Sequence, residues 1–273
     1  MNTPQSISYP DNGNPLEDPA VLRNAVNFST QERAYSAQLI LQHLTDASQA
    51  SLNFLIVRAF EEFMTSTEDL TGWLFVLQEW QPGDARNSIF SLLDRVAVGK
   101  GRHKEANAVS LLSAIDADAF QKLIHVPTYE ELVSTGKIEL ANRLKQSIPA
   151  KLDGWRTIVA KRANQDRGLV GMFNKLKHHM LAFPTMERGK AEIWMPFNVV
   201  NDYADGKLTA LRMGRGWLGA NLDSIRMFVY DAITAQAVLH DTLALILITR
   251  YNYTHTVPQW ITQVYQGSYI WQV

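Results

Sequence analysis

Cysteine is missing from the chain, since none of its 273 residues is a cysteine. This absence excludes disulfide bonds, thiolate metal ligands and thiol nucleophiles. It agrees with a reducing compartment, so we expect a cytoplasmic protein.

An excess of one charge is missing as well, because 26 lysines and arginines stand against 27 acidic residues and the formal net charge is −1. Any contact with an anionic polymer must therefore come from a local basic patch.

Long unbroken apolar runs are also lacking. Residues 1–17 combine prolines with polar side chains and contain neither the basic nor the apolar region of a signal peptide. The most apolar segment, residues 232–249, is interrupted by Gln236, His240 and Asp241. It falls short of the about 20 consecutive apolar residues that a membrane span needs. We predict that this segment is a buried core helix, and we expect no membrane partner.

Several motifs of metal and nucleotide enzymes are absent too. The chain contains no His-Glu-x-x-His, no Glu-x-x-His pair and no Gly-x-x-x-x-Gly-Lys-Ser/Thr. The acidic residues Glu61, Glu62, Glu68 and Asp69 offer oxygen ligands for a hard cation, but their spacing is not that of a calcium loop. The alternative, a solvated helix face, is the one we favour. The sequence thus predicts no metal and no cofactor.

Helical periodicity dominates what is present. A Ser-x-x-Glu capping box at Ser29 and Glu32 predicts a helix start. Apolar residues then recur with a period near 3.6 from Tyr35 to Phe63, which predicts one long helix or two nearly collinear ones. A shorter helix over 70–80 is expected to end at the Pro-Gly pair that follows it.

The rest of the chain continues this pattern with one interruption. A capping box at Thr128 and Glu131 and a cap at Asn221 predict two further helix starts, the second opening a last long helix to about Tyr253. β-prone segments around the turn-rich residues 201–206 predict a hairpin. Other predicted helices cover 85–98, 104–115, 117–124, 138–165 with a kink near Pro149, and 168–183.

These elements predict a mainly α fold, a helical bundle with long antiparallel helices and a small β-hairpin insertion near 191–213. A hydrophobic share of 46% is ample for its core. We expect an extended N-terminal arm at 1–27, a single helical domain at 28–257 and an apolar, aromatic tail at 258–273. The tail is too apolar to stay in water, so it docks on its own chain or on a second copy. The second alternative predicts a homodimer.

The predicted helix at 168–183 carries the most suggestive side chains. Its apolar residues form one seam, while Asn174, Lys175 and His178 share another face. Lys175 and His178 lie one turn apart, so they are suited to hold a phosphate while His178 transfers a proton. Lys177 and His179 extend this basic segment. The alternative is a solvated cationic helix end that offsets the helix dipole.

The end of the last predicted helix contains a second basic pair, Arg250 and His255. The spacing resembles the Arg-x4–6-His signature of the HEPN family, helical-bundle proteins that often dimerise and include metal-independent ribonucleases. The resemblance implies that Arg250 and His255 act around a scissile phosphate. Tyr251 stands where that family often has a polar residue. The stretch 174–178 also resembles the basic helix of divergent HEPN-like proteins, with lysine in place of the catalytic arginine, which implies an inactive nuclease.

A third basic feature is the glycine-containing stretch 99–104, which carries Lys100, Arg102 and Lys104. Its amides and side chains are suited to meet a phosphate. The alternative, which we favour, is a surface connector. Two functions remain open on this sequence. One is a helical interaction protein, with a degenerate HEPN-like RNA-binding module as its specific form, and the other is a metal-independent HEPN-like ribonuclease with RNA as substrate.

Overall fold

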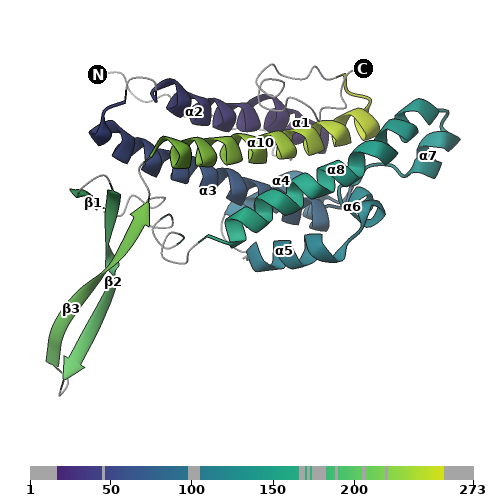
Figure 1. Cartoon of the computed structure of the whole chain (residues 1–273). Coiled ribbons are helices and arrows are strands. Elements are labelled where there is room, and N and C mark those ends of the chain that lie inside the picture. Colours follow the sequence, from purple (N-terminus) through teal and green to yellow (C-terminus); the bar gives the residue numbers. More distant parts are fainter. Residues whose placement is uncertain are drawn as a thin grey trace, which may run out of the picture.

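The computed structural model describes residues 17–44, 47–97, 105–165, 170, 173, 183–187, 190–204, 207–218 and 221–254. Its helices form one elongated body, from which a ribbon of strands extends (Figure 1). The mainly α class is therefore confirmed. The helices, including the π-helical turn η1 and the 3-10 turn η2, are α1 (Asp18–Asn24), η1 (Ala25–Ser29), α2 (Thr30–Gln42), α3 (Gln49–Glu79), η2 (Ala85–Asn87), α4 (Ile89–Ala97), α5 (Glu105–Ala114), α6 (Ala117–Leu123), α7 (Tyr129–Ser134), α8 (Ile138–Ala163) and α10 (Leu222–Tyr251).

The two longest helices, α3 and α10, lie side by side through the middle of the body (Figure 1). They run parallel, because Phe60 meets Phe228 near their starts and Trp80 meets Arg250 near their ends. This differs from the predicted antiparallel arrangement. The helices α2 and α8 do run antiparallel to α10. The start of α2 contacts His240 through Thr30, while its end joins Phe228 in one core cluster. Along α8, Lys151 pairs with Asp241 and Lys161 with Asp231.

The helix α10 is long and apolar enough to cross a membrane by length and composition alone. In this fold 83% of its most apolar window is buried inside the protein, as in the core helix of a globular domain. Two core clusters share α3 and α10, one containing Phe60, Phe63 and Phe228, the other Trp80 and Trp155. The predicted burial of residues 232–249 is thus confirmed, and both clusters depend on the same pair of helices.

The helices α8 and α10 meet at an unusually close approach. A Cβ atom placed on Gly154 would lie 3.1 Å from Val238 Cγ2. Near this point, Lys151 pairs with Asp241, and Trp155 Nε1 donates to Thr242 Oγ1 at 3.0 Å. A glycine at the crossing lets the backbones approach, and the two polar contacts fix the register of α8 on α10.

The chain becomes helical earlier than the sequence predicts. Residues 18–27, expected in the extended arm, belong to α1 and η1, because Val21, Leu22 and Val26 are buried in or beside the core. The predicted cap at Ser29 is wrong, since Ser29 has helical φ and ψ and its side chain makes no capping hydrogen bond. The arm at 1–16 lies outside the described residues.

The helix boundaries in the centre also differ in one respect. The break falls after α2, at Gln42, while α3 continues unbroken through the position where a separate helix was expected at 70–80. Gly72 lies inside α3, where an added Cβ would meet Val96 Cγ1 at 3.2 Å. The capping box at Thr128 and the cap at Asn221 are confirmed, each with its side chain accepting the expected backbone amide.

The strands are β1 (Phe183–Glu187), β2 (Lys190–Ala204) and β3 (Lys207–Leu218), which form one antiparallel sheet in the order β1-β2-β3. The β2–β3 register runs from Ala191 opposite Leu218 to Ala204 opposite Lys207, with an irregularity between Met195 and Val200. These strands occupy the stretch where the hairpin insertion at 191–213 was predicted. The prediction of a helix up to residue 183 is wrong at its last position, because Phe183 begins β1, while most of the predicted helix at 168–183 lies outside the described residues.

Candidate functional site

Of the predicted site residues, only Arg250 lies within the described part of the chain. The others fall outside it, namely His178, His255 and Lys175 as catalytic candidates and Asn174, Lys177, His179, Lys100, Arg102 and Lys104 as nucleic-acid contacts. The structure therefore does not test whether the three basic features converge. One described neighbour of the basic segment, Phe173, is buried, and the Arg162 guanidinium lies 6.0 Å from the centre of its ring.

Arg250, in the last turn of α10, is exposed but engaged by the protein. Its guanidinium carbon lies 5.9 Å from the centre of the Trp80 ring, and its Nε donates to the backbone carbonyl of His125. A guanidinium over an indole face is attracted by the ring quadrupole. Arg250 thus joins the end of α10 to the end of α3 and to the turn after α6.

His125 is the second member of this junction. It adopts the left-handed conformation with φ 54°, and its ring packs edge-on against Trp80 with centroids 4.7 Å apart. Its Nε2 lies 2.8 Å from the Leu77 carbonyl oxygen, so the neutral ring carries its proton on Nε2 and donates it. Burial lowers the pKa of His125 below 6.5, the carbonyl partner opposes that change, and the Arg250 charge adds to it.

Asp18 completes the junction from the N-terminal side. Its carboxylate accepts from Trp80 Nε1 and from the Ile89 amide, both at 2.8 Å. Burial raises the pKa of the neighbouring Tyr251 above 10.0, the charge of Asp18 raises it further, and Arg250 opposes the rise. We call Asp18, Trp80, His125 and Arg250 the Arg250 junction. Its contacts join α1, α3, α4, the turn after α6 and α10. The Arg250 junction therefore has a structural role.

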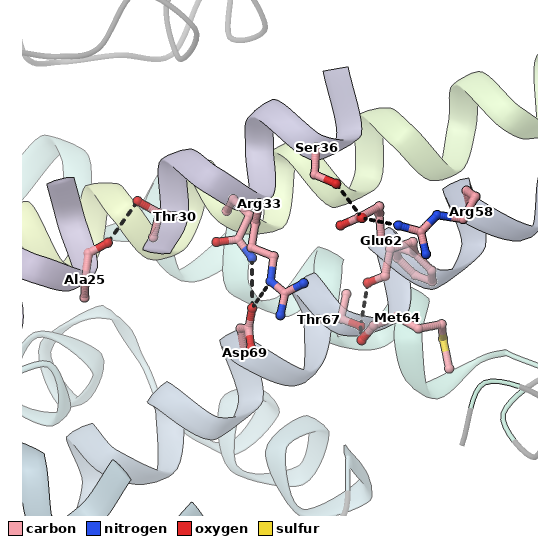
Figure 2. Close-up of polar contacts among 11 residues, drawn as sticks. Ala25, Thr30, Arg33, Ser36, Arg58, Glu62, Met64, Thr67 and Asp69 are labelled. Atoms are coloured by element: carbon pink, nitrogen blue, oxygen red, sulfur yellow. Dashed lines mark hydrogen bonds and ion pairs between the residues drawn. The ribbon is translucent and has the colours of Figure 1, made fainter. Parts of the chain in front are cut away.

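A second polar region lies where α2, α3 and α10 meet. Figure 2 shows Ser36 of α2 and Arg58 of α3 pointing toward Glu62. Ser36 Oγ donates to Glu62 Oε1 at 2.6 Å, and Arg58 Nη2 lies 3.6 Å from the same oxygen. Glu62 is only 5% exposed, and its Oε2 finds no hydrogen-bond partner in the described part of the chain, nor does the buried Ser66 Oγ. A buried carboxylate oxygen without a partner is costly, so this position is energetically strained.

Nearly two turns earlier on α2, Thr30 contacts α10 at His240, and both residues are buried. Thr30 Oγ1 lies 3.2 Å from the Val26 carbonyl oxygen and 3.0 Å from His240 Nδ1. Because the single hydroxyl proton goes to a backbone carbonyl, His240 Nδ1 donates to Thr30. Thr30 directly follows the π-helical turn η1, and such turns inside α-helices are often found at functional sites.

Beside η1 the structure contains a cavity of about 450 Å³. It is bounded by α1, η1, α2, α3, α4 and α10, and Arg33 and Asp69 flank it, with side chains 44% and 38% exposed. Arg33 Nε lies 3.5 Å from Asp69 Oδ2, and Gln236 Nε2 donates to that oxygen at 3.4 Å. Figure 2 shows Arg33 and Asp69 pointing toward each other across α2 and α3.

The predicted solvated acidic face is therefore wrong for one of its members, because Glu62 is buried between helices. Asp69 keeps a partly exposed side chain and lines the cavity. The signal was present in the sequence, because Glu62, Ser66 and Asp69 recur at the four- and three-residue steps of one helix face. Within the described ranges, no group of three His, Cys, Asp or Glu side chains is arranged to hold a metal ion.

A Gly-x-Gly-x-x-Gly pattern occupies residues 214–219, at the end of β3 and just before α10. In dinucleotide-binding proteins this motif follows a strand of a parallel βαβ unit. Here β3 pairs antiparallel with β2, and Gly214 and Gly216 stand opposite Met195 and Ile193. The backbone context of a dinucleotide site is thus not provided by these strands.

Comparison with known proteins adds no relative, since no protein-family model, curated protein or solved structure matches this chain significantly.

Proposed function

We propose that this protein is a non-enzymatic helical interaction protein whose binding surface is a degenerate HEPN-like RNA-binding module. The observation that carries the proposal is the state of Arg250. A catalytic arginine must be free to stabilise the charge that develops on the scissile phosphate. Arg250 instead donates its Nε to the His125 carbonyl and covers the Trp80 ring, so its first role is to join helices.

RNA is the ligand we propose because two short segments of a nearly neutral chain, 100–104 and 174–179, are rich in basic side chains. The Arg250 side chain is exposed, which leaves its Nη groups available for a phosphate contact while its Nε is bound. In this proposal the strands over 191–213 form the hairpin insertion that the sequence predicts, and the tail at 258–273 supports self-association.

The test is an assay of a mixed pool of short RNAs with the purified protein in the presence of EDTA, at low and at moderate salt. The wild type is compared with the double variant His178→Ala/His255→Ala. We expect binding that weakens with salt, because phosphate contacts release counterions, and no cleavage by either protein. Absence of binding at low salt would reject an RNA-binding function.

The alternative is the metal-independent HEPN-like ribonuclease, which the exposure of Arg250 at the end of α10 favours. In that case His255 or His178 transfers a proton, and Arg250 or Lys175 stabilises the phosphate charge. Cleavage by the wild type that disappears in the double histidine variant would establish this alternative. It would also overturn the non-enzymatic proposal.

Self-association is tested separately by removing residues 258–273. The shortened chain is compared with the full chain by sedimentation and by thermal unfolding. A change from dimer to monomer supports an interaction surface formed by the tail. If oligomeric state, stability and RNA binding all stay the same, the tail has no part in the function.

A further inference from the structure

The cavity beside η1 is the one described feature that combines volume, charge and an unusual backbone. Its walls come from helices far apart in the sequence, with Asn24 and Ser29 on one side and Gln236 and Leu239 of α10 on the other. The π-helical turn inserts an extra residue into the helix that runs from α1 to α2, and its residues Ala25 and Ser29 both line the cavity. A π-helical turn changes where the following side chains point, so it helps to open this space.

The charges at the cavity favour a cationic ligand. Glu32 and Asp69 contribute two carboxylates, and Arg33 contributes one guanidinium. The ion pair between Arg33 and Asp69 is long and partly exposed, so it contributes little stability. An incoming ammonium group is able to replace Arg33 at Asp69 with small loss and to leave the lining neutral.

One part of the lining is apolar, which favours an organic body behind that charge. Trp73 follows Asp69 by one helical turn on α3, so an indole and a carboxylate lie on the same helix face. An ammonium group near both gains an ion pair and attraction to the indole ring. Leu93 and Leu239 supply further apolar wall. The rest of the lining is polar, with Asn24, Ser29, Thr30 and Gln236 beside the charged residues, and the cavity volume lies in the range typical of small-molecule sites.

We propose that this cavity is a binding site for a small organic amine with an apolar body, whose ammonium group binds Asp69 and Glu32 while the body lies against Trp73 and Leu239. The site is separate from the Arg250 junction and does not depend on RNA binding. The two proposals therefore succeed or fail independently.

The probe for the test is phenethylamine, measured with the full-length protein by isothermal titration calorimetry. Phenethyl alcohol and phenylacetate are the neutral and anionic counterparts of similar size. We expect phenethylamine to bind, phenethyl alcohol to bind at least about tenfold more weakly, and phenylacetate not to bind, because a charge-assisted contact has roughly this effect on affinity. Trp73 fluorescence should change on binding of the amine.

The variants Asp69→Asn and Glu32→Gln remove one carboxylate each and keep the side-chain shape, and both should weaken phenethylamine binding. Glu32 is exposed, so Glu32→Gln tests the site even where Asp69→Asn alters folding. The matched control is Asp118→Asn, an exposed carboxylate of a different cavity, which should bind as the wild type does. No binding of phenethylamine, equal binding of the alcohol, or full binding by Glu32→Gln would overturn the proposal.

Discussion

At the scale of single residues, the Arg250 junction explains why one side chain is read so differently from sequence and from structure. Six residues around Arg250 resemble a nuclease signature, but spacing along a chain does not reveal which groups a side chain already binds. The partners of Arg250 come from α3 and from the turn after α6, more than a hundred positions away. The sequence thus indicates Arg250 as a candidate residue but contains no local signal of its contacts in the fold.

Replacing Arg250 by alanine should destabilise the protein by about 1 kcal/mol, because the cation–π contact with Trp80 and the hydrogen bond to His125 are lost together. Arg250→Lys should recover only part of this loss, since lysine keeps the charge without the planar group. Arg226→Ala, an exposed arginine of the same helix, is the control and should change little. Urea unfolding measures all three. Equal stabilities of Arg250→Ala and Arg226→Ala would contradict the structural role.

His125 gives the protein a pH dependence of known sign. Its pKa is lowered by burial in the folded state, while the unfolded chain keeps the ordinary value of 6.5. The unfolded state therefore binds a proton first as the pH falls, and stability declines below about pH 6.5 until the lowered folded pKa is reached. His125→Asn removes this titration and tolerates the left-handed backbone. The wild type should lose more unfolding free energy than His125→Asn between about pH 7.5 and pH 5.5. Parallel pH profiles would contradict this account.

Glu62 provides the third residue-scale prediction. Glu62→Ala should destabilise the protein by about 2–3 kcal/mol, because loss of the acceptor of the partly buried Ser36 hydroxyl and the opening of a cavity outweigh the removal of the unpartnered Oε2. The neighbouring Glu61 is the matched control, since it also pairs with Arg58 but at 2.6 Å and closer to solvent. Glu61→Ala should cost less than about 1 kcal/mol. Similar losses in both variants, measured by urea unfolding, would show that burial of Glu62 is not what matters.

At the scale of helices, the contact between α8 and α10 makes a prediction about packing. Gly154→Ala should destabilise the protein by about 1 kcal/mol, because the close approach to Val238 outweighs the better helix propensity of alanine. Val238→Ala alone also destabilises by leaving a void. Together the two changes should cost less than the sum of the single losses, since the new methyl group fills part of the void. A double-mutant cycle in urea measures this coupling, and additive losses would contradict it.

Comparison of elements shows which parts of the fold the sequence predicts and why. The caps at Thr128 and Asn221 are local hydrogen bonds between neighbours in the chain, and both are present. The start at Asp18 has a local signal in Pro19, but the Asp18 carboxylate also accepts hydrogen bonds from Trp80 and Ile89, and no local pattern displays these. Gly72 reads as a helix end, but inside α3 it serves the close approach of Val96 from α4. The errors thus occur where tertiary contacts override local preference.

At the scale of the whole molecule, the cavity beside η1 is a feature that the sequence alone does not predict. Its charged residues are ordinary members of separate helices, and only folding brings Arg33, Asp69 and Gln236 together. The sequence carries the helical period that places Asp69 and Trp73 on one face, but not the partner helices that close the space around them. A site assembled from six elements is therefore predicted only after the arrangement of those elements is known.

The sharing of α3 and α10 by both core clusters predicts that the helical body unfolds as one unit. Phe60 packs on Phe228 in one cluster, with ring centroids 5.3 Å apart, while Trp155 lies in the other cluster. Phe60→Leu should cost about 1–2 kcal/mol and lower the urea midpoint of the whole body, because neither cluster persists without the helices that it shares with the other. The exposed Phe90 serves as control, and Phe90→Leu should leave the midpoint unchanged.

The measurement follows two signals during urea unfolding. Far-UV circular dichroism reports total helix, and fluorine NMR of fluorotryptophan-labelled protein reports the Trp155 environment, with its resonance assigned through Trp155→Phe. Coincident midpoints that shift together in Phe60→Leu mean that α3 and α10 transmit the loss from one cluster to the other. If the Trp155 midpoint stays in place while the helix signal splits into two transitions, the clusters are separate domains and the single helical domain predicted for this chain is wrong.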